Sequence, residues 1–433
     1  MQTPARQATQ RAIDAVWRIE SAKIVAGVAR LVRDIGLAEE LAQDALVAAL
    51  EHWPTDGVPH NPGAWLMTTA KHRALDHLRH LQLQARKHEQ IGADLEAMEA
   101  LTVPDFVDGL DAKRADEIGD DLLRLIFTAC HPLLGTDARL ALTLKLLGGL
   151  STDEIARAFL VPEATIAQRI VRAKRTLAAA KVPFEVPRGA ELGARLASVL
   201  EAIYLIFNEG YTATSGSDWM RPALCDEALR LGRVLAGLAP LEPEVHGLVA
   251  LMELQASRAA ARIDAEGRPV LLLDQQRARW DHLLIRRGLA ALERAEQLGG
   301  AAGPDLGPYT LQAAIAACHA RAALAEQTDW ARIAALYDTL AAVMPSPVVA
   351  LNRAVAVGMA FGPAAALELV DALRSEPALR HYHWLPAVRG DLLAKLGRHG
   401  EAREAFTEAA ALARNDRERE LLSARAAAQP PSA

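Results

Sequence analysis

The chain has 433 residues, more than one hydrophobic core usually serves, which indicates roughly two to four domains. Hydrophobic residues make up 51% of it but aromatic residues only 4%, a composition that favours an all-α protein. The net charge of −6 does not by itself favour nucleic acid, and no apolar run reaches the roughly 20 residues that span a bilayer.

The chemistry-bearing residues do not form a recognisable catalytic or metal pattern. Cys130, Cys225 and Cys318 lie far apart, which suits buried thiols in a reducing cytoplasm better than disulfides or a metal site. The histidines of His381-Tyr-His383 lack a suitably spaced third ligand. We find no nucleophile–base pair, Gly-rich phosphate loop or signal peptide. We therefore expect a cytoplasmic protein without membrane association that is not an enzyme and needs no metal or cofactor.

An acidic helix follows the first helical pattern, which covers about 8–33. Its sequence is LAEELAQDALVAALEHW (37–53), and 34–51 holds five acidic and no basic residues, a net of −5. Such a helix repels DNA and suits a basic protein partner. A solvated helix of a bundle is the alternative, and without further context it is the more common one.

A basic helix comes next, after the break WPTDGVPHNPG. Asn61-Pro62 supplies a cap and a first-turn proline, and 61–90 has a net charge of +3. The apolar positions share one arc of the helical wheel: Leu66, Met67, Ala70, Ala74, Leu78 and Leu81. Trp65 lies opposite, with Thr69, His72, Asp76 and Arg79. An exposed tryptophan either packs under the preceding loop or stacks on an unpaired base.

Two helices joined by a tight turn are predicted between 151 and 177, beyond a turn-rich stretch and further helices from 120. Ser151 and Glu154 form a capping box, and Val161-Pro162 ends the first helix. In the second helix Ile166, Ile170, Ala173 and Leu177 share one arc. The opposite side carries Thr165, Gln168, Arg169, Arg172 and Thr176, and 162–181 has a net charge of +4.

A short helix, a turn and a basic second helix with a polar face are typical of a DNA-binding helix-turn-helix. An ordinary helix pair with a solvated basic face is the alternative. Order and spacing of these elements make the chain resemble a two-domain bacterial sigma factor. More narrowly, it is similar to extracytoplasmic-function sigma factors with a long helical C-terminal extension, a likeness that continues through YLIFNEGYTA (204–213) and LNRAVAVGMAFGP (351–363). Leu160 replaces a turn glycine of generic members, and His72 a common asparagine, leaving turn geometry and promoter preference open.

The resemblance implies a division of the chain and a set of contacts. Region two would occupy 8–82, a linker 83–119, region four 120–182, and a tetratricopeptide-like extension 190–433. Core RNA polymerase would bind the acidic helix through Glu39, Glu40, Gln43, Asp44, Val47 and Glu51. The minus-ten promoter element would contact Trp65, Thr69, Lys71, His72, Arg73, Asp76 and Arg79. The minus-thirty-five element would contact Thr165, Gln168, Arg169, Arg172, Lys174 and Arg175.

The C-terminal half shows traces of a 34-residue helical repeat. In 386–413, Gly390, Phe406 and Ala409 have the spacing of its small and aromatic positions; Tyr337 and Pro345 match in an earlier unit, and a copy at 225–262 is faint. Such stacks present a groove for a protein partner. Contact between the extension and the sigma domains is a further expectation. Gly210 is expected to end a helix, and 182–189 to be an exposed hinge after a sigma half that folds alone.

Two other functions stay open. A helix-turn-helix regulator acting without polymerase would leave the acidic helix and Trp65 unexplained, and a peptide-binding scaffold would leave the basic helix unexplained. The sequence does not indicate the inducing signal, the promoter sequence or the oligomeric state.

Overall fold

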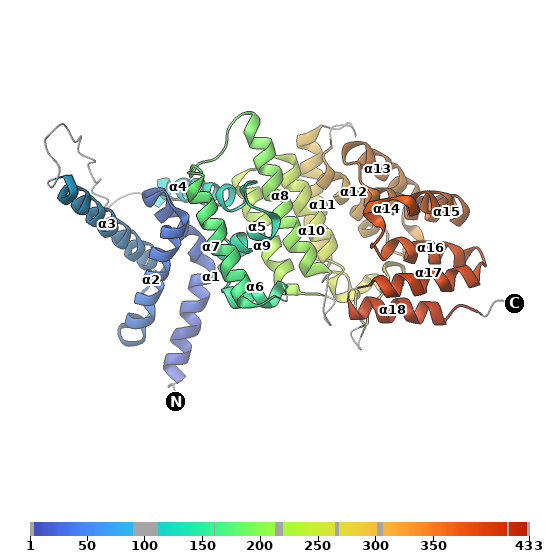
Figure 1. Cartoon of the computed structure of the whole chain (residues 1–433), viewed down its shortest axis with the longest axis horizontal. Coiled ribbons are helices and arrows are strands. Elements are labelled where there is room, and N and C mark those ends of the chain that lie inside the picture. Colours follow the sequence, from blue (N-terminus) through green and yellow to red (C-terminus); the bar gives the residue numbers. More distant parts are fainter. Residues whose placement is uncertain are drawn as a thin grey trace. The chain divides into compact units, whose positions relative to one another are not determined.

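The structure is a computed structural model that describes residues 4–89, 111–159, 161–212, 220–264, 268–300, 306–413 and 415–430. Within these ranges it is helical and contains no β-strand, and an isolated β-bridge joins Ile263 and Pro269. The predicted all-α class is confirmed. The chain divides into two compact units, Met1–Ala202 and Ile203–Ala433. Figure 1 labels the helices of both.

The first three helices form a bundle in which each packs on the other two: α1 (Pro4–Val32), α2 (Ile35–Asp56) and α3 (Pro62–Glu89). Asp34 caps α2 by accepting from the amides of Gly36 and Leu37. Asn61 caps α3 as predicted, accepting from the Ala64 amide at 3.2 Å. Buried alanines on all three helices let the backbones approach closely.

The predicted apolar arc of α3 is buried only along its first half. Leu66, Ala70 and Ala74 are fully buried, whereas Leu81 is 46% exposed. The helix also continues to Glu89, and α4 begins at Asp111, so both ends of the expected linker are helical. Its middle, like Leu160, lies outside the described residues.

Four helices make up the next layer: α4 (Asp111–Ala129), α5 (Thr136–Leu146), α6 (Thr152–Phe159) and α7 (Glu163–Ala179). The capping box of α6 is present, because the Ser151 amide donates to Glu154 (2.8 Å) and the Glu154 amide to the Ser151 hydroxyl (3.1 Å). The predicted arc of α7, including Ile166 and Ile170, is buried. The helix-turn-helix therefore forms as expected, with α6 and α7 packed on each other and on α5.

Helix α8 (Ala190–Tyr211) corrects two expectations. Gly210 does not end a helix: it lies inside the last turn of α8, where an added Cβ would lie 2.6 Å from the Cys225 amide nitrogen. The glycine is required by close approach rather than by a turn. The first compact unit also extends to Ala202, beyond the boundary expected at 182–189.

The first half of α8 is bonded to region four. The Arg195 guanidinium donates to the Phe127 carbonyl at 3.0 Å, and the Ser198 hydroxyl donates to the Cys130 carbonyl at 2.6 Å. Arg139 donates to Ser198 at 2.5 Å. Residues assigned to the extension from sequence thus complete the core of the preceding domain.

The second unit continues as helices that pack on their neighbours in chain order. They are α9 (Pro222–Leu238), α10 (Pro243–Ala256), α11 (His282–Gly299), α12 (Pro308–Arg321), α13 (Trp330–Val343), α14 (Pro347–Phe361), α15 (Pro363–Ala372), α16 (Trp384–Lys395), α17 (His399–Leu412) and α18 (Asp416–Ala427). Six short 3₁₀ turns connect some of them within the described ranges: η1 (Ala259–Ala261), η2 (Leu272–Asp274), η3 (Arg277–Arg279), η5 (Ala325–Gln327), η6 (Leu373–Ser375) and η7 (Pro377–Leu379).

The predicted small and aromatic repeat positions form one core around α16 and α17. Phe406 is fully buried, and an added Cβ at Gly390 would lie 3.0 Å from its ring. Leu393, Ala402 and Ala409 are fully buried in the same cluster. The small residues let the helices approach, and the aromatic ring fills the space between them, as in helical repeats.

Candidate nucleic-acid interface

The second helix of the helix-turn-helix, α7, presents a polar face opposite its buried arc. Gln168, Arg172 and Arg175 are exposed and lie three or four residues apart, so they form one continuous stripe. Thr165 is half-buried at the start of the same stripe. This face can offer amide and guanidinium donors to base edges in a major groove.

Two of the basic residues expected on this face have partners inside the protein. Arg169 pairs with Asp137 of α5 at 2.7 Å, and its side chain is 31% exposed. Lys174 lies beside the buried arc rather than opposite it, because it is one turn from Ile170, and its ammonium pairs with Glu39 of α2. In this form Lys174 does not belong to the exposed stripe.

The helix α3 also exposes a polar face. His72, Arg73, Asp76 and Arg79 are exposed, and Arg79 pairs with Asp76 at 3.2 Å. Lys71 is half-buried. The basic charge of this face is thus partly neutralised from within the helix.

Trp65 is half-buried and packs against a second tryptophan. Its ring meets the fully buried Trp53 of α2 edge to face, with 5.5 Å between centroids, and the Thr69 hydroxyl donates to its carbonyl at 2.8 Å. Packing therefore accounts for part of the side chain. The exposed part stays available to a stacking partner.

The residues expected on the acidic helix separate into two groups. Glu40, Gln43, Asp44, Val47 and Glu51 are exposed and follow helical spacing along one face, which we call the α2 stripe. Val47 contributes an apolar surface that is 49% exposed, and Asp44 lies 3.8 Å from Arg73 of α3. Such a mixture of acidic and apolar side chains fits a basic protein surface.

Glu39 has a different environment. It is only 5% exposed, and its carboxylate faces Lys145 of α5 at 3.8 Å as well as Lys174. Gln43 donates to it at 2.9 Å. A helical step of 100° separates Glu39 from Glu40 and turns it toward region four.

A second polar contact joins α1 to the helix-turn-helix. Arg18 pairs with Glu154, the residue that caps α6. Burial raises the pKa of Glu154, but hydrogen bonds from Ser151 and the charge of Arg18 outweigh it and hold the pKa below its ordinary value. The carboxylate therefore stays ionised while it serves both partners. Nothing in the local sequence around Arg18, Asp137 or Lys145 indicates these partners, because each pairs with a residue distant in the chain.

The remaining titratable groups named from sequence are structural in the described ranges. Cys130 and Cys225 are buried, and burial raises the pKa of their thiols to about 11 and about 12. The Nε2 atom of His383 lies 3.1 Å from the Glu418 carboxylate. The described ranges contain neither a cluster of three metal-type side chains nor a helix of the length and apolarity needed to cross a membrane.

Comparison with known proteins matches three parts of the chain to family models. These are "Sigma-70 region 2" at 20–83, "Sigma-70, region 4" at 124–177, and "Family of unknown function (DUF6596)" at 195–296. An uncharacterised protein of Rhizobium meliloti is 46% identical over 89% of this chain and 88% of its own length. The ECF RNA polymerase sigma factor SigK of Mycobacterium ulcerans is 31% identical over 35% of this chain and 75% of its own length. The chain belongs to the ECF family of RNA polymerase sigma factors.

The sigma-factor resemblance covers only the first unit. The probable sigma-C factor of Mycobacterium bovis is likewise 29% identical over 41% of this chain and 88% of its own length. The match to region two begins inside α1 and ends inside α3, and the match to region four begins inside α4 and ends inside α7. The alignment with yeast Tom70 covers 98% of this chain and 84% of the Tom70 chain, at 11% identity and a TM-score of 0.36. That TM-score is too low to establish a shared fold.

Proposed function

We propose that this sigma factor directs core RNA polymerase to a dedicated set of promoters, with α3 and α7 contacting DNA and α2 contacting polymerase. The observation that carries the proposal is the exposed face of α7, where Gln168, Arg172 and Arg175 stand opposite a fully buried arc. A polar stripe on the second helix of a helix-turn-helix is the geometry that reads base edges in the major groove.

The minus-thirty-five contacts would come from this stripe with Thr165. Arg169 and Lys174 would join them only after leaving Asp137 and Glu39. The minus-ten contacts would come from the exposed face of α3, where the free part of Trp65 can stack on an unpaired base.

Polymerase would bind the α2 stripe. Its acidic side chains and Val47 project together from the unit, which supports docking on a basic surface with an apolar centre. The relatives named as RNA polymerase sigma factors support the same assignment.

The helical extension would support or regulate transcription by binding a protein. Its Gly390–Phe406 core and successive helix pairs support a repeat stack of the kind that presents a groove to peptides. No enzymatic step is proposed for it.

Run-off transcription with purified core polymerase tests the proposal. We expect this chain to support initiation from cognate promoters and to co-purify with core polymerase. A regulator that acts without polymerase is the competing function, and it predicts specific DNA binding with no co-purification. Initiation that is absent on every candidate promoter, together with absent core binding, contradicts the proposal.

A further inference from the structure

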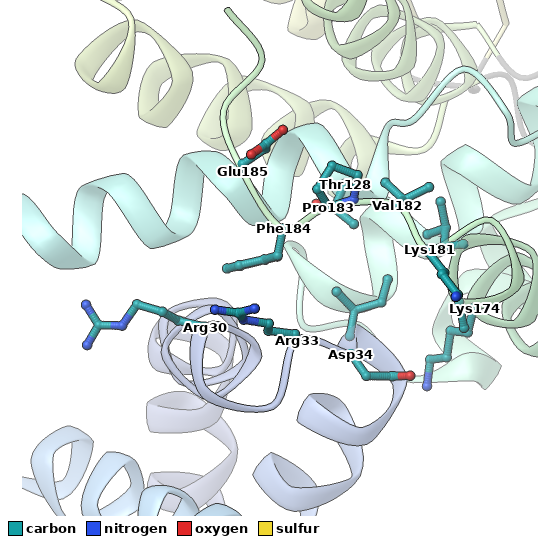
Figure 2. A pocket seen from close by; sticks show the side chains of 13 residues that line it. Arg30, Arg33, Asp34, Thr128, Lys174, Lys181, Val182, Pro183, Phe184 and Glu185 are labelled. Atoms are coloured by element: carbon teal, nitrogen blue, oxygen red, sulfur yellow. The ribbon is translucent and has the colours of Figure 1, made fainter. Parts of the chain in front are cut away.

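The first unit contains a cleft of the size that binds small molecules. Its volume is about 610 Å³, within the range of roughly 300–1,000 Å³ that is usual for such sites. Helices α1, α2, α4 and α7 line it together with the segment 182–185, and Figure 2 shows the lining side chains. Apolar side chains form part of its wall, among them Leu177, Val182 and Pro183, and cationic side chains form another part. The cleft therefore suits a molecule that is partly apolar and carries negative charge.

Four cations line the cleft, and the protein neutralises only two of them. Arg30 and Lys174 each pair with a carboxylate of the first unit. Arg33 and Lys181 are exposed, and the side chain of neither forms an ion pair or hydrogen bond with any described residue. These two charges are available to an anionic ligand without the loss of an existing contact.

Two carboxylates also line the cleft, and each is directed elsewhere. Asp34 caps α2, where it accepts from two amides of the first turn at 2.7 and 2.9 Å. In Figure 2 the side chain of Glu185 points away from Arg33, whereas the ring of Phe184 points toward the side on which Arg33 lies. An aromatic ring and a free guanidinium thus face the same part of the cleft.

The backbone at the two free cations is unusual. Arg33 follows α1 with a φ of 55°, and Lys181 follows α7 with a φ of 48°; among the described residues, all others with a positive φ are glycines. Both amides close helix-ending bonds, from Arg33 to the Ala29 carbonyl at 2.8 Å and from Lys181 to the Ala178 carbonyl at 3.0 Å. Glycine is the usual residue at such a position because it adopts positive φ without strain. Both positions therefore carry a strain that glycine would remove.

The helix dipole does not account for this choice of residues. A cation near a helix C-terminus interacts favourably with the partial negative charge there. A residue with ordinary helical φ in the last turn would provide the same interaction without strain. Positive φ instead changes the direction in which the side chain leaves the helix, and at both positions the side chain lines the cleft. Strain of this kind collects at ligand-binding sites.

We propose that this cleft binds a nucleotide. Arg33 and Lys181 hold its phosphate groups, because guanidinium and ammonium donors form strong, charge-assisted hydrogen bonds with phosphate oxygens. The half-buried ring of Phe184 stacks on the base, and the apolar wall covers the rest of the ring system. A free phosphate would leave both the aromatic ring and the apolar wall without a partner. Binding requires neither promoter DNA nor polymerase, so it is independent of the proposed function.

Calorimetric titration and thermal shift of the full-length chain test this site, with the four ribonucleoside triphosphates and inorganic pyrophosphate as probes. At least one nucleotide should raise the melting temperature and should bind more tightly than pyrophosphate. Arg33→Gly and Lys181→Gly should melt no lower than wild type, because glycine relieves the strain, but each should weaken nucleotide binding by about tenfold or more. Arg380→Gln is the matched control, since it removes an exposed cation of the second unit and should leave binding unchanged.

A fourth variant separates the base from the phosphates. Phe184→Leu should weaken nucleotide binding by about tenfold and leave pyrophosphate binding unchanged, which also shows that the variant is folded. Absence of binding by all four nucleotides overturns the inference, and so does wild-type affinity in both glycine variants. A fall in melting temperature in both glycine variants would assign the two cations to the fold and overturn it as well. Pyrophosphate that binds as tightly as every nucleotide would overturn the assignment to a nucleotide.

Discussion

Replacing Ser198 by Ala should destabilise region four although the residue lies beyond the predicted hinge. The Ser198 hydroxyl accepts from Arg139 at 2.5 Å and donates to the Cys130 carbonyl at 2.6 Å, and Ser198 is only 6% exposed. The substitution removes both bonds and leaves a buried carbonyl without this donor. It should therefore act like a core mutation of region four rather than like a change in a peripheral extension.

The magnitude follows from the two bonds. A hydrogen bond to a charged group contributes about 1.5–3 kcal/mol and a neutral one about 0.5–1.5 kcal/mol. Arg139 keeps Glu201 at 3.0 Å, so we expect the lower part of the sum, about 2–3 kcal/mol. For a unit of this size that corresponds to a fall in melting temperature of about 4–12 °C.

Differential scanning fluorimetry of the full-length chain would measure this loss. Ser423→Ala is a matched control, because Ser423 is exposed on α18 and the change should be nearly neutral. A Ser198→Ala protein that melts like wild type would refute the assignment of α8 to the core of region four. A chain ending at 186 should for the same reason be less stable than the sigma half of the intact protein.

Four further outcomes are expected. Arg172→Ala should keep the melting temperature but lower promoter discrimination by about 1–3 kcal/mol in competition binding; unchanged transcription would exclude it from the interface. Trp65→Ala should lower the melting temperature modestly, by loss of an aromatic pair worth about 0.5–1.5 kcal/mol, and should impair promoter opening in permanganate footprinting; normal opening would leave it a packing role alone. Glu40→Lys should weaken core-polymerase pull-down at low salt while Glu408→Lys on α17 does not; equal binding would put the docking surface elsewhere. Burial and the charges of Arg258 and Arg277 lower the pKa of His319 to about 3. Between pH 6.5 and 3, His319 is therefore protonated in the unfolded chain but neutral in the folded chain. Stability should fall by up to about 1.4 kcal/mol per pH unit from pH 6.5 toward 3, and His319→Phe should flatten that slope in acid unfolding.

Local features of this protein could be predicted because short-range interactions determine them. The capping box of Ser151 and Glu154 closes within one helical turn, and the buried arc that includes Ile166 follows from helical periodicity. The all-α class and the helix-turn-helix could be predicted from these local patterns. The resemblance to ECF sigma factors also rested on such local elements in a particular order.

The exposure of individual site residues depended on distant partners. Glu39 and Glu40 are neighbours in an acidic helix and look equivalent in sequence, but one is buried between two lysines and the other is exposed. The sequence predicts that Lys174 belongs to the DNA-contacting face of a basic helix, but in the structure its ammonium pairs with Glu39. Periodicity gives the angle of a side chain about its own helix, not the helix that it faces.

Domain limits and glycine roles required the tertiary structure for the same reason. Pro183 and Pro187 mark a change in composition, yet Ser198 still bonds to region four, because a domain ends where its contacts end. Glycine often ends a helix, but Gly210 is required for another reason: the Cys225 backbone comes so close that there is no room for a Cβ. The sequence by itself determined which helices form and which faces they bury. Packing between residues far apart in the chain decided which charges are buried, where a compact unit ends and how region four packs on region two.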